Sequence, residues 1–520
     1  MIRHIIQKEL RVNILSMRFH AGLAVSALMM GIVGYVLIED YAARVQKYIA
    51  DVQEHREALA QTKVYSMVAI VVDIPPSPLS VFSRGSQDLP TSVRVSPYHV
   101  PSAADEAGEG ATISLHGTGS RPSNPLLRMF SSIDLTFVIS TILSLFAVIL
   151  VFDSFSGELE QGTLKMLLSA SAGRAQLYAG KFLGALVSLA IPLTVGFLEV
   201  IVLWTIHPGL ALDARAWADA GLVYLCSLLF LSSFLALALL IALYARESSS
   251  CLMTLLLAWV GVAVVIPAGG EYLAEGTRPV SARENLLAAE ARSKADFEKT
   301  IEGIDYRQIG GWNNASTDQF EGESLLGITA EEVQNRLAYN LKVFPLKFRF
   351  AEDHYSAVEA YGQELRSWRG VRENMIRPSL CVQYSNLVSA LAGTDAAAFE
   401  ETVARARRYR DALMSFLQPR VESPRWFTRA LDYPDVQPTE ANRAYWQSLI
   451  DHQGERAVER ILSWDRVAPV DLAGLPTPVL APPGAGERAE RAMPDLLLLF
   501  ACCGLCCTLG IIRVRRYPLN

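Results

Sequence analysis

The stretch FDSFSGELEQGTLKMLLSASAGRAQLYAGK, residues 152–181, is a polar, amphipathic segment between two long apolar runs. Glu158 and Glu160 stand where a short helix would begin, and acidic side chains at that position oppose the helix dipole. The leucines from Leu159 to Leu168 can form one apolar face of this helix. The pattern predicts a short amphipathic helix in the loop between two membrane helices.

Glycines and basic residues shape the rest of this stretch. Gly157 can end the preceding membrane helix, and Gly162 allows another backbone to approach closely. Residues 169–173 predict a turn, after which Arg174 and Lys181 are expected at the membrane surface. An ordinary amphipathic loop helix would carry the same leucines, so amphipathicity alone does not assign a role.

The composition indicates membrane helices with sizeable water-exposed domains. The chain has 520 residues, of which 51% are hydrophobic, and its mean hydropathy is +0.24. These values are high for a soluble protein and low for a pure membrane bundle. The net charge of -6 gives no indication of a nucleic-acid partner. Only Cys381 lies in a polar region, so the polar regions hold neither a disulfide framework nor a metal motif.

Six runs are apolar and long enough to cross a membrane, which takes about 20 residues in a helix. They are residues 19–38, 133–152, 177–206, 218–244, 251–268 and 496–512. Lys181, near the start of the third run, is the one basic residue of Lys or Arg type inside them. The first run is followed by Glu39-Asp40 and not by a small-residue cleavage site, so we expect an uncleaved helix.

Basic residues at both ends of the chain set the predicted orientation. Residues 1–18 contain four of them, and the tail 513–520 contains three arginines. Because loops rich in Lys and Arg stay in the cytoplasm, both termini and the segment 153–176 are placed there. Residues 39–132 and 269–495 then form two extracytoplasmic domains. If one apolar run were instead a buried helix of a soluble domain, this topology would change.

The first extracytoplasmic domain is predicted to be mixed α/β. A helix over Tyr41–Lys63 precedes a strand-like run over 64–73. Prolines then predict a rigid turn, because they fix φ and lack a backbone donor. This turn carries an outer-domain motif made of Pro75, Pro78, Leu79, Ser80, Phe82 and Gly85. Residues 104–124 are rich in Gly, Ser and Ala and predict a flexible loop.

The second extracytoplasmic domain is larger and predicted to be mostly helical. Helices are expected over Ser281–Ile301, Thr329–Val343, Ala357–Arg369 and Ala396–Leu417. Thr394 and Asp395 are candidate caps for the last of these. A proline-rich linker over 466–484 leads back to the membrane, where Pro494 suits a first helical turn.

The order Gly-Glu-x-Glu-x-Gly-Thr-Leu at 157–164, followed by Arg174 and Gly180-Lys181, resembles the cytoplasmic coupling segment of the ABC-2 family of ATP-driven export permeases. Ser171 departs from the proline that this family often has in the turn. The resemblance implies a mainly α, polytopic membrane protein with six transmembrane helices of the ABCG-like, type V exporter kind. It implies ATPase-coupling roles for Gly157, Glu158, Glu160, Gly162, Thr163, Leu164, Arg174 and Lys181.

Several distant segments resemble one subset of these permeases, which is linked to the maturation of multi-copper enzymes. They are the outer-domain motif at 75–85, Arg377–Leu380, Leu391–Asp395 and Ala492–Leu496. Residues 1–18 alternate apolar and basic side chains and can lie in the membrane interface as an amphipathic helix. Within the resemblance this helix would touch the ATPase; otherwise it is a simple membrane-flanking anchor.

The resemblance implies a permease subunit that works with other chains. The sequence has no Gly-x-x-x-x-Gly-Lys-Ser/Thr, no His-Glu-x-x-His and no Gly-x-Ser-x-Gly, so we predict no catalytic residue and no bound cofactor. ATP and Mg are expected on two partner ATPase subunits, with a second permease, like or unlike, in a bacterial inner membrane. One alternative is mechanical signalling to a periplasmic partner without transport, and another is a membrane-embedded enzyme.

Glu199 is a candidate for the transport pathway or an outer gate, because a carboxylate inside a membrane run is expensive. Counted from Leu177 it lies ~33 Å along the helix, near the outer end, where it could instead be an interface residue that reaches water. Pro192 can kink the same helix.

The run Cys502-Cys503-Gly-Leu-Cys506-Cys507 places two pairs of cysteines on shared helix faces. Thiolates suit copper(I), but cysteine is also a small apolar residue that packs well in membranes. No His or Met partner stands nearby, so the sequence predicts no metal site.

Overall fold

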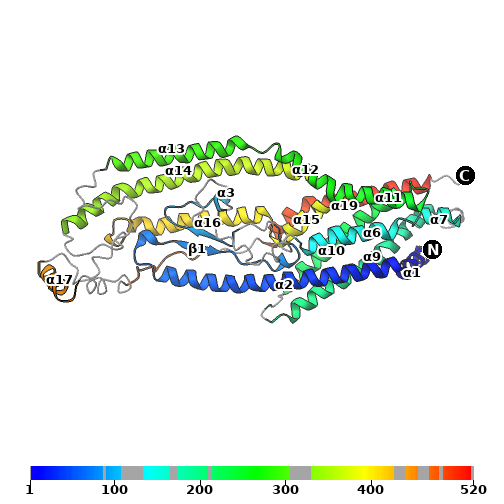
Figure 1. Cartoon of the computed structure of the whole chain (residues 1–520), viewed down its shortest axis with the longest axis horizontal. Coiled ribbons are helices and arrows are strands. Elements are labelled where there is room, and N and C mark those ends of the chain that lie inside the picture. The colour runs from blue at the N-terminus through cyan, green and yellow to red at the C-terminus, as the bar shows by residue number, and fades with distance from the viewer. Residues whose placement is uncertain are drawn as a thin grey trace.

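The computed structural model describes residues 2–85, 90–106, 133–163, 173–208, 210, 214–304, 330–426, 440–454, 468–478 and 484–516. Within these residues, six helices are long and apolar enough to cross a membrane, in agreement with the six predicted runs. They gather at one end of an elongated molecule, and a mostly helical distal part extends away from them (Figure 1).

Four of the six membrane-length segments are single helices: α2 (Met17–Ala60), α9 (Arg174–Ile206), α10 (Ala214–Ala242) and α19 (Ala485–Arg515). The second joins α5 (Leu135–Val138), the π-helical turn η3 (Ile139–Leu143) and α6 (Ser144–Val151). The fifth joins α11 (Ser248–Val260), the π-helical turn η4 (Gly261–Val265) and α12 (Ile266–Glu275). Helix α1 (Ile2–Ile14) precedes the first segment, and α7 (Ser156–Glu160) follows the second.

Helix α2 runs without a break from the membrane bundle into the distal part (Figure 1). Ser16 caps its start by accepting a hydrogen bond from the Phe19 N–H. The sequence predicted a membrane run that ends at residue 38 and a separate helix over Tyr41–Lys63, and the structure joins the two. Arg44 donates to Asp40 one turn away at 2.8 Å, which continues the helix past the end of the apolar run. The 44 residues make a rod about 66 Å long.

Helix α15 (Leu380–Ala392) packs inside the membrane bundle, although its sequence lies between the fifth and sixth runs. Tyr384 is buried, stacks on Phe230 of α10 with ring centroids 4.7 Å apart, and shares a hydrogen bond with Ser227 Oγ at 2.7 Å. At 13 residues, or about 20 Å, the helix is too short to cross a bilayer. The sequence placed this helix in the predicted extracytoplasmic domain over 269–495 and did not predict that it packs in the membrane bundle.

The start of α15 contacts both π-helical turns. Ser379 Oγ donates to the Val262 carbonyl in η4 at 2.6 Å, and Cys381 Sγ donates to the Ser140 carbonyl in η3 at 3.5 Å. A π-helical turn leaves carbonyls without their usual helical partners, and these side chains supply replacements. The irregular turns in the second and fifth segments therefore serve as docking points for α15.

The distal part has its own core around a small sheet. Strand β1 (Ile70–Asp73) pairs antiparallel with β2 (Ser92–Val95), and Val72 faces Val93. Helix α16 (Ala396–Leu417) packs on this sheet, and Trp426 is fully buried in the same core. The predicted strand over 64–73 is shorter than expected because Tyr65–Met67 forms a 3-10 turn.

Long helices flank this core. Helices α13 (Val280–Glu302) and α14 (Ala330–Ile376) lie side by side along one edge of the distal part, and α17 (Glu440–Gln453) lies at its far tip (Figure 1). Helix α14 unites the predicted helices Thr329–Val343 and Ala357–Arg369 and contains Pro345. The short helix α3 (Ala103–Glu106) takes up the first residues of the predicted loop over 104–124, whose remainder lies outside the described residues.

One predicted helix start is wrong, and one predicted cap lacks its side-chain hydrogen bond. Pro494 lies well inside α19, because that helix begins at Ala485, where the Gly484 N–H donates to Glu487 Oε2 at 2.9 Å. Asp395 stands at the cap position of α16, but its side chain accepts no capping hydrogen bond. Its carboxylate instead lies 3.4 Å from Arg491 Nη1.

Candidate functional site

Lys181 is buried at the junction of three segments, and its place at the membrane surface stays a prediction. Its side chain is 2% exposed. Its Nζ lies 3.0 Å from Glu9 Oε1 of α1 and 3.0 Å from Glu158 Oε2 of α7, and it donates to the Ser154 carbonyl at 2.7 Å. One ammonium group of α9 therefore holds the N-terminal helix and the predicted coupling segment together.

Two glycines of α9 bring α1 close enough for this contact. A Cβ at Gly180 would lie 2.7 Å from Ile5 Cγ2, and one at Gly184 would lie 2.7 Å from Glu9 Cβ. No larger side chain fits at either position, so α1 lies directly on the backbone of α9. The Phe155 ring lies 5.3 Å from Lys181 Nζ and covers it from another side.

Lys8 completes a set of two ammonium and two carboxylate groups, which we call the Lys181 cluster (Lys8, Glu9, Glu158 and Lys181). Lys8 Nζ lies 2.7 Å from Glu158 Oε1, and its side chain is 50% exposed. Burial lowers the pKa of Lys8, but its hydrogen bond to Glu158 and the charges of Glu158 and Glu9 outweigh this, so the pKa is raised. The cluster is formally neutral, which lets a buried charge persist.

Of the two glycines of the coupling segment, Gly157 has a different role from the one predicted. Gly157 does not end the preceding helix, because α6 ends at Val151, a turn follows, and Gly157 lies inside α7. Gly162 has a left-handed φ of 71°, and a Cβ there would meet nothing within 4 Å among the described residues. Glycine at 162 therefore serves the backbone conformation and not a close contact within the described chain.

Other predicted coupling residues join this segment to more distant helices. Glu160 Oε1 accepts a hydrogen bond from the Ser248 N–H at 2.7 Å, at the start of α11. Thr163 Oγ1 donates to the Glu158 carbonyl at 3.2 Å. Arg174 donates to the Arg515 carbonyl at 2.8 Å, at the end of α19. Leu164 and the turn with Ser171 lie outside the described residues.

An exposed ion pair lies beside the Lys181 cluster. Arg18 Nη1 is 2.7 Å from Asp153 Oδ2, and the two side chains are 48% and 38% exposed. Solvent screens such pairs strongly, so this pair contributes little to stability. This exposed pair therefore serves as a control for the contribution of the buried ion pairs nearby.

Glu199 is partly exposed on α9 and stands seven residues before that helix ends at Ile206, which is the position that the count from Leu177 gives. Its Oε2 is 3.5 Å from where a Cβ of Gly31 on α2 would lie, and it has no hydrogen-bond partner among the described residues. Gly31 is eight residues, or about 12 Å, before Glu39. Glu39 Oε1 in turn lies 3.6 Å from His207 Nε2, just past the end of α9. Pro192 is buried within α9.

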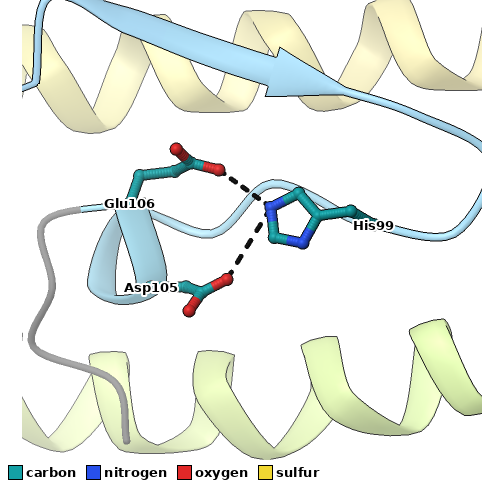
Figure 2. Close-up of side chains that lie close together, drawn as sticks. All are labelled: His99, Asp105 and Glu106. Atoms are coloured by element: carbon teal, nitrogen blue, oxygen red, sulfur yellow. Dashed lines mark hydrogen bonds and ion pairs between the residues drawn. The ribbon is translucent and has the colours of Figure 1, made fainter. Parts of the chain in front are cut away.

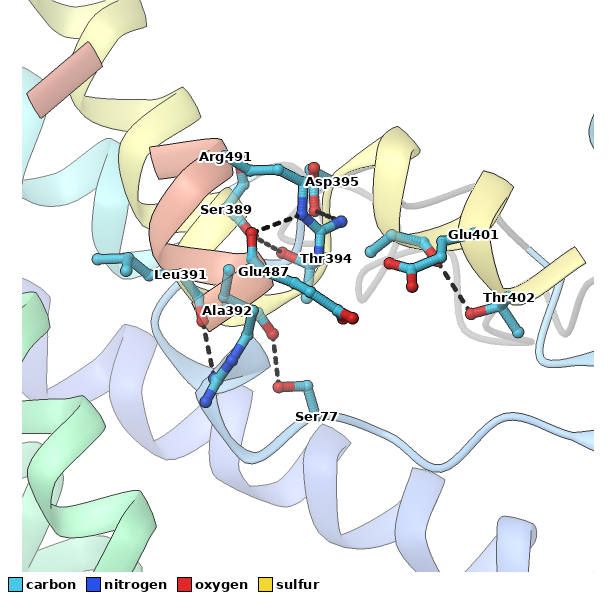
Figure 3. A network of polar contacts seen from close by, with 12 residues as sticks. Ser77, Ser389, Leu391, Ala392, Thr394, Asp395, Glu401, Thr402, Glu487 and Arg491 are labelled. Atoms are coloured by element: carbon cyan, nitrogen blue, oxygen red, sulfur yellow. Dashed lines mark hydrogen bonds and ion pairs between the residues drawn. The ribbon is translucent and has the colours of Figure 1, made fainter. Parts of the chain in front are cut away.

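Two of the family-like segments meet at the distal end of the bundle. The outer-domain motif at 75–85 packs against the turn 391–395 between α15 and α16; we call this contact the distal joint. Ser77 Oγ donates to the Ala392 carbonyl at 2.6 Å (Figure 3), and Thr394 Oγ1 donates to the Ser83 carbonyl at 3.2 Å. Thr394 is thus used for this contact and not as a helix cap.

Three of the six residues of the outer-domain motif, Leu79, Ser80 and Phe82, are buried. Pro78 starts the 3-10 turn η2 (Pro78–Val81), which buries Leu79 and Ser80. Phe82 stacks on Phe197 of α9 with ring centroids 5.3 Å apart. Gly85 has a φ of 60°, and a Cβ there would lie 2.0 Å from the Thr394 carbonyl oxygen. Pro75 lies just after β1 and is partly buried.

Two further family-like segments join each other by a paired ionic contact. Arg377 Nε and Nη2 donate to the two carboxylate oxygens of Asp495 at 2.9 and 3.1 Å. Asp495 is only 5% exposed, so this bidentate pair links the start of α15 to α19 in a sheltered place. The four cysteines at 502–507 are free thiols on α19, where Cys506 is buried and the others are partly buried.

Sequence reasoning missed how the Lys181 cluster is assembled. It predicted an amphipathic interfacial helix over residues 1–18 without singling out Glu9, and it placed Lys181 at the membrane surface without a partner. Two signals were present: Lys181 is the one basic residue of Lys or Arg type in the apolar runs, and glycines stand at 180 and 184. Neither signal could name the partner, because Glu9 is 172 positions away in the sequence.

Comparison with known proteins places these contacts in a family context. A family model described as "ABC-2 family transporter protein" matches residues 3–306. The chain is similar to the probable ABC transporter permease protein NosY of Pseudomonas aeruginosa, with 43% identity over 63 residues, 12% of this chain and 23% of that protein. It is also similar to the protein of the same description from Stutzerimonas stutzeri, with 34% identity over 110 residues, 21% of this chain. The chain thus spans 23% and 40% of the length of these curated relatives.

Replacing Lys181 by Met is expected to destabilise the protein strongly, because it leaves Glu9 and Glu158 buried without their shared cation. Removing one partner of a buried ionic contact costs about 3–5 kcal/mol. Lys8→Ala removes a half-exposed partner of the same Glu158 and should cost under about 1 kcal/mol. Thermal unfolding of both variants in detergent measures the difference. Equal losses would show that Lys181 is no more important than a surface lysine.

Gly85→Ala is expected to lower the unfolding temperature more than Gly474→Ala. Both glycines have left-handed φ values, 60° and 83°, so both changes carry the same backbone strain of about 1–2 kcal/mol. Only at Gly85 would the added methyl group also overlap the Thr394 carbonyl, since nothing lies within 4 Å at Gly474 among the described residues. The same unfolding temperature for the two variants would contradict the close packing of the distal joint.

Proposed function

The chain belongs to the ABC-2 family of transporter proteins, and from this premise we propose that it is the permease subunit of an ATP-driven exporter that couples a partner ATPase to substrate movement. Membership in this family implies ATPase partner chains and a membrane setting. The observation that carries the proposal is the Lys181 cluster, in which α1, α7 and α9 meet at one buried charge.

The cluster supports the proposal because it makes the predicted coupling segment part of a larger unit. A push on α7 by an ATPase acts on Glu158, whose partners Lys181 and Lys8 belong to α9 and α1. Sliding α7 alone would separate these charges in a sheltered site, which is costly. Movement of the three helices together keeps the ion pairs and passes the push to the membrane bundle. ATP binding would then shift the bundle between two populated states.

The proposed complex contains two permeases, like or unlike, and two ATPase subunits. A single set of six membrane helices cannot enclose a full pathway, which is the reason for the second permease. ATP and Mg bind to the ATPase chains, and this chain binds no nucleotide. The basic residues at both ends of the chain support an inner-membrane location with both termini in the cytoplasm. Glu199, which faces Gly31 of α2, is the proposed pathway residue, with Pro192 on the same helix.

Mechanical transmission without transport is a second candidate, and one observation favours it. Helix α2 extends without a break from the Lys181 cluster end of the bundle to the sheet of the distal part (Figure 1). Phe82 and Gly85 tie this distal part to α9 and to the α15–α16 turn. Such a rod could move a periplasmic partner through the distal part while nothing crosses the membrane.

Glu158→Gln tests the coupling role. The variant keeps the shape of the side chain but removes the charge that pairs with Lys181 and Lys8. In a complex reconstituted with its ATPase in lipid vesicles, we expect permease-stimulated ATP hydrolysis to fall at least fivefold while the ATPase still co-purifies. Asp153→Asn is the matched control, because it removes the exposed pair with Arg18 nearby and should leave hydrolysis unchanged. Normal stimulation in the Glu158→Gln complex would contradict the coupling assignment.

The same vesicles separate the two candidates. If the protein is an exporter, Glu199→Gln should alter the stimulation of ATP hydrolysis by substrate. The change in hydrogen exchange that ATP causes at the distal joint should be the same in this variant as in the unchanged protein. Under mechanical transmission, Glu199→Gln should be without effect, and ATP should still change the hydrogen exchange of residues 75–85. A distal joint that does not respond to ATP in either protein would exclude the mechanical candidate.

A further inference from the structure

A histidine and two carboxylates converge in the distal part of the protein (Figure 2). His99 follows β2, and Asp105 and Glu106 belong to α3. His99 Nε2 lies 2.8 Å from Glu106 Oε1 and 3.7 Å from Asp105 Oδ2. One ligand-type atom from each residue lies within 4.8 Å of the others.

The backbone that carries these residues is held in place by neighbouring helices. Arg410 of α16 is buried and donates to the Ser96 and Pro97 carbonyls at 3.3 and 2.9 Å, which fixes the turn before His99. Helix α3 packs on α14 through buried Ala104, whose Cβ lies 3.3 Å from where a Cβ of Gly362 would lie. The three side chains are therefore positioned before any ligand arrives.

A second histidine supports Asp105 from the side of α14. His354 Nε2 lies 3.7 Å from Asp105 Oδ2, and its Nδ1 lies 3.4 Å from Glu290 Oε1 of α13. The contact with the Asp105 carboxylate, 3.7 Å away, raises the pKa of His354. Burial raises the pKa of Asp105, but the contact with His354 and the charges of both histidines lower it below its usual range. This chain of contacts orients the Asp105 carboxylate, as partners behind a metal ligand commonly do.

We propose that His99, Asp105 and Glu106 bind a divalent transition-metal ion of the zinc class, with His354 and Glu290 orienting Asp105. Ligand atoms around a tetrahedral ion with bonds of 2.0–2.1 Å are about 3.3 Å apart. The distances from His99 Nε2 to Glu106 Oε1, 2.8 Å, and to Asp105 Oδ2, 3.7 Å, lie on either side of this value. One imidazole and two carboxylates suit Zn²⁺ or a similar divalent ion and not the thiophilic copper(I). Three protein ligands leave one position for water or an exchangeable group.

The sequence could not predict this site. His99 and the pair Asp105-Glu106 do not follow a metal-binding motif, and the supporting groups come from residues 290 and 354. Only the packing of α3 against α14 brings these four segments together. An ion there would link the turn after β2 and α3, and through Asp105 it would tie them to the α13–α14 pair.

The test is a Zn²⁺ titration of the full-length protein in detergent, by calorimetry and by metal analysis after dialysis. The four cysteines at 502, 503, 506 and 507 are first replaced by alanine, so that membrane thiols cannot bind the ion. We expect one Zn²⁺ per chain and an unfolding temperature that rises with Zn²⁺. Ca²⁺ and Mg²⁺ should produce no comparable rise, because the site lacks the six or more oxygen ligands they use.

His99→Gln and Glu106→Gln should each weaken Zn²⁺ binding at least tenfold, with metal-free unfolding temperatures close to that of the parent protein. His55→Gln is the matched control, because among the described residues His55 of the same distal part pairs with Asp73 alone, at 2.9 Å. Unchanged binding in both His99→Gln and Glu106→Gln would overturn the proposal. So would loss of the bound ion in the protein without the four cysteines, or equal binding of Ca²⁺.

Discussion

The burial of the Lys181 charge is the constraint on which the rest of the structure depends. An ammonium group removed from water must keep its counter-charges close, and here these come from Glu9 and Glu158. The glycines at 180 and 184 let α1 approach closely enough to supply one of them. As a result, the N-terminal helix, the segment after the second span and the third span form one unit.

This unit is connected to the distal end of the bundle by continuous helices. Helix α9 carries Lys181 near its start and Phe197 near its other end, where Phe82 of the distal joint stacks on it. Helix α2 runs alongside and continues to the small sheet. A displacement at the Lys181 cluster therefore has a direct mechanical route to the distal joint. Export and mechanical transmission would both use this route, and they differ in whether Glu199 meets a substrate.

The sequence predicted what depends on local pattern. The six apolar runs, the N-terminal amphipathic helix and the bounds of α16 follow from periodicity and composition. The sequence did not predict the features that depend on contacts between residues far apart in the chain. The continuity of α2 was missed because Glu39-Asp40 ends the apolar run while the helix goes on, and α15 was missed as part of the bundle because its partners lie on α10 and α19. The site was predicted in part: Glu158 and Lys181 were named, but their buried contact was not.

Native-state hydrogen exchange of the unchanged protein in lipid nanodiscs tests the central claim most directly. If one buried charge unites α1, α7 and the start of α9, their amides should become exchangeable through a single opening with the same free energy and the same dependence on denaturant. If residues 2–14 exchange through an opening that leaves residues 156–160 and 180–184 protected, the three segments are independent. In that case the Lys181 cluster does not couple them.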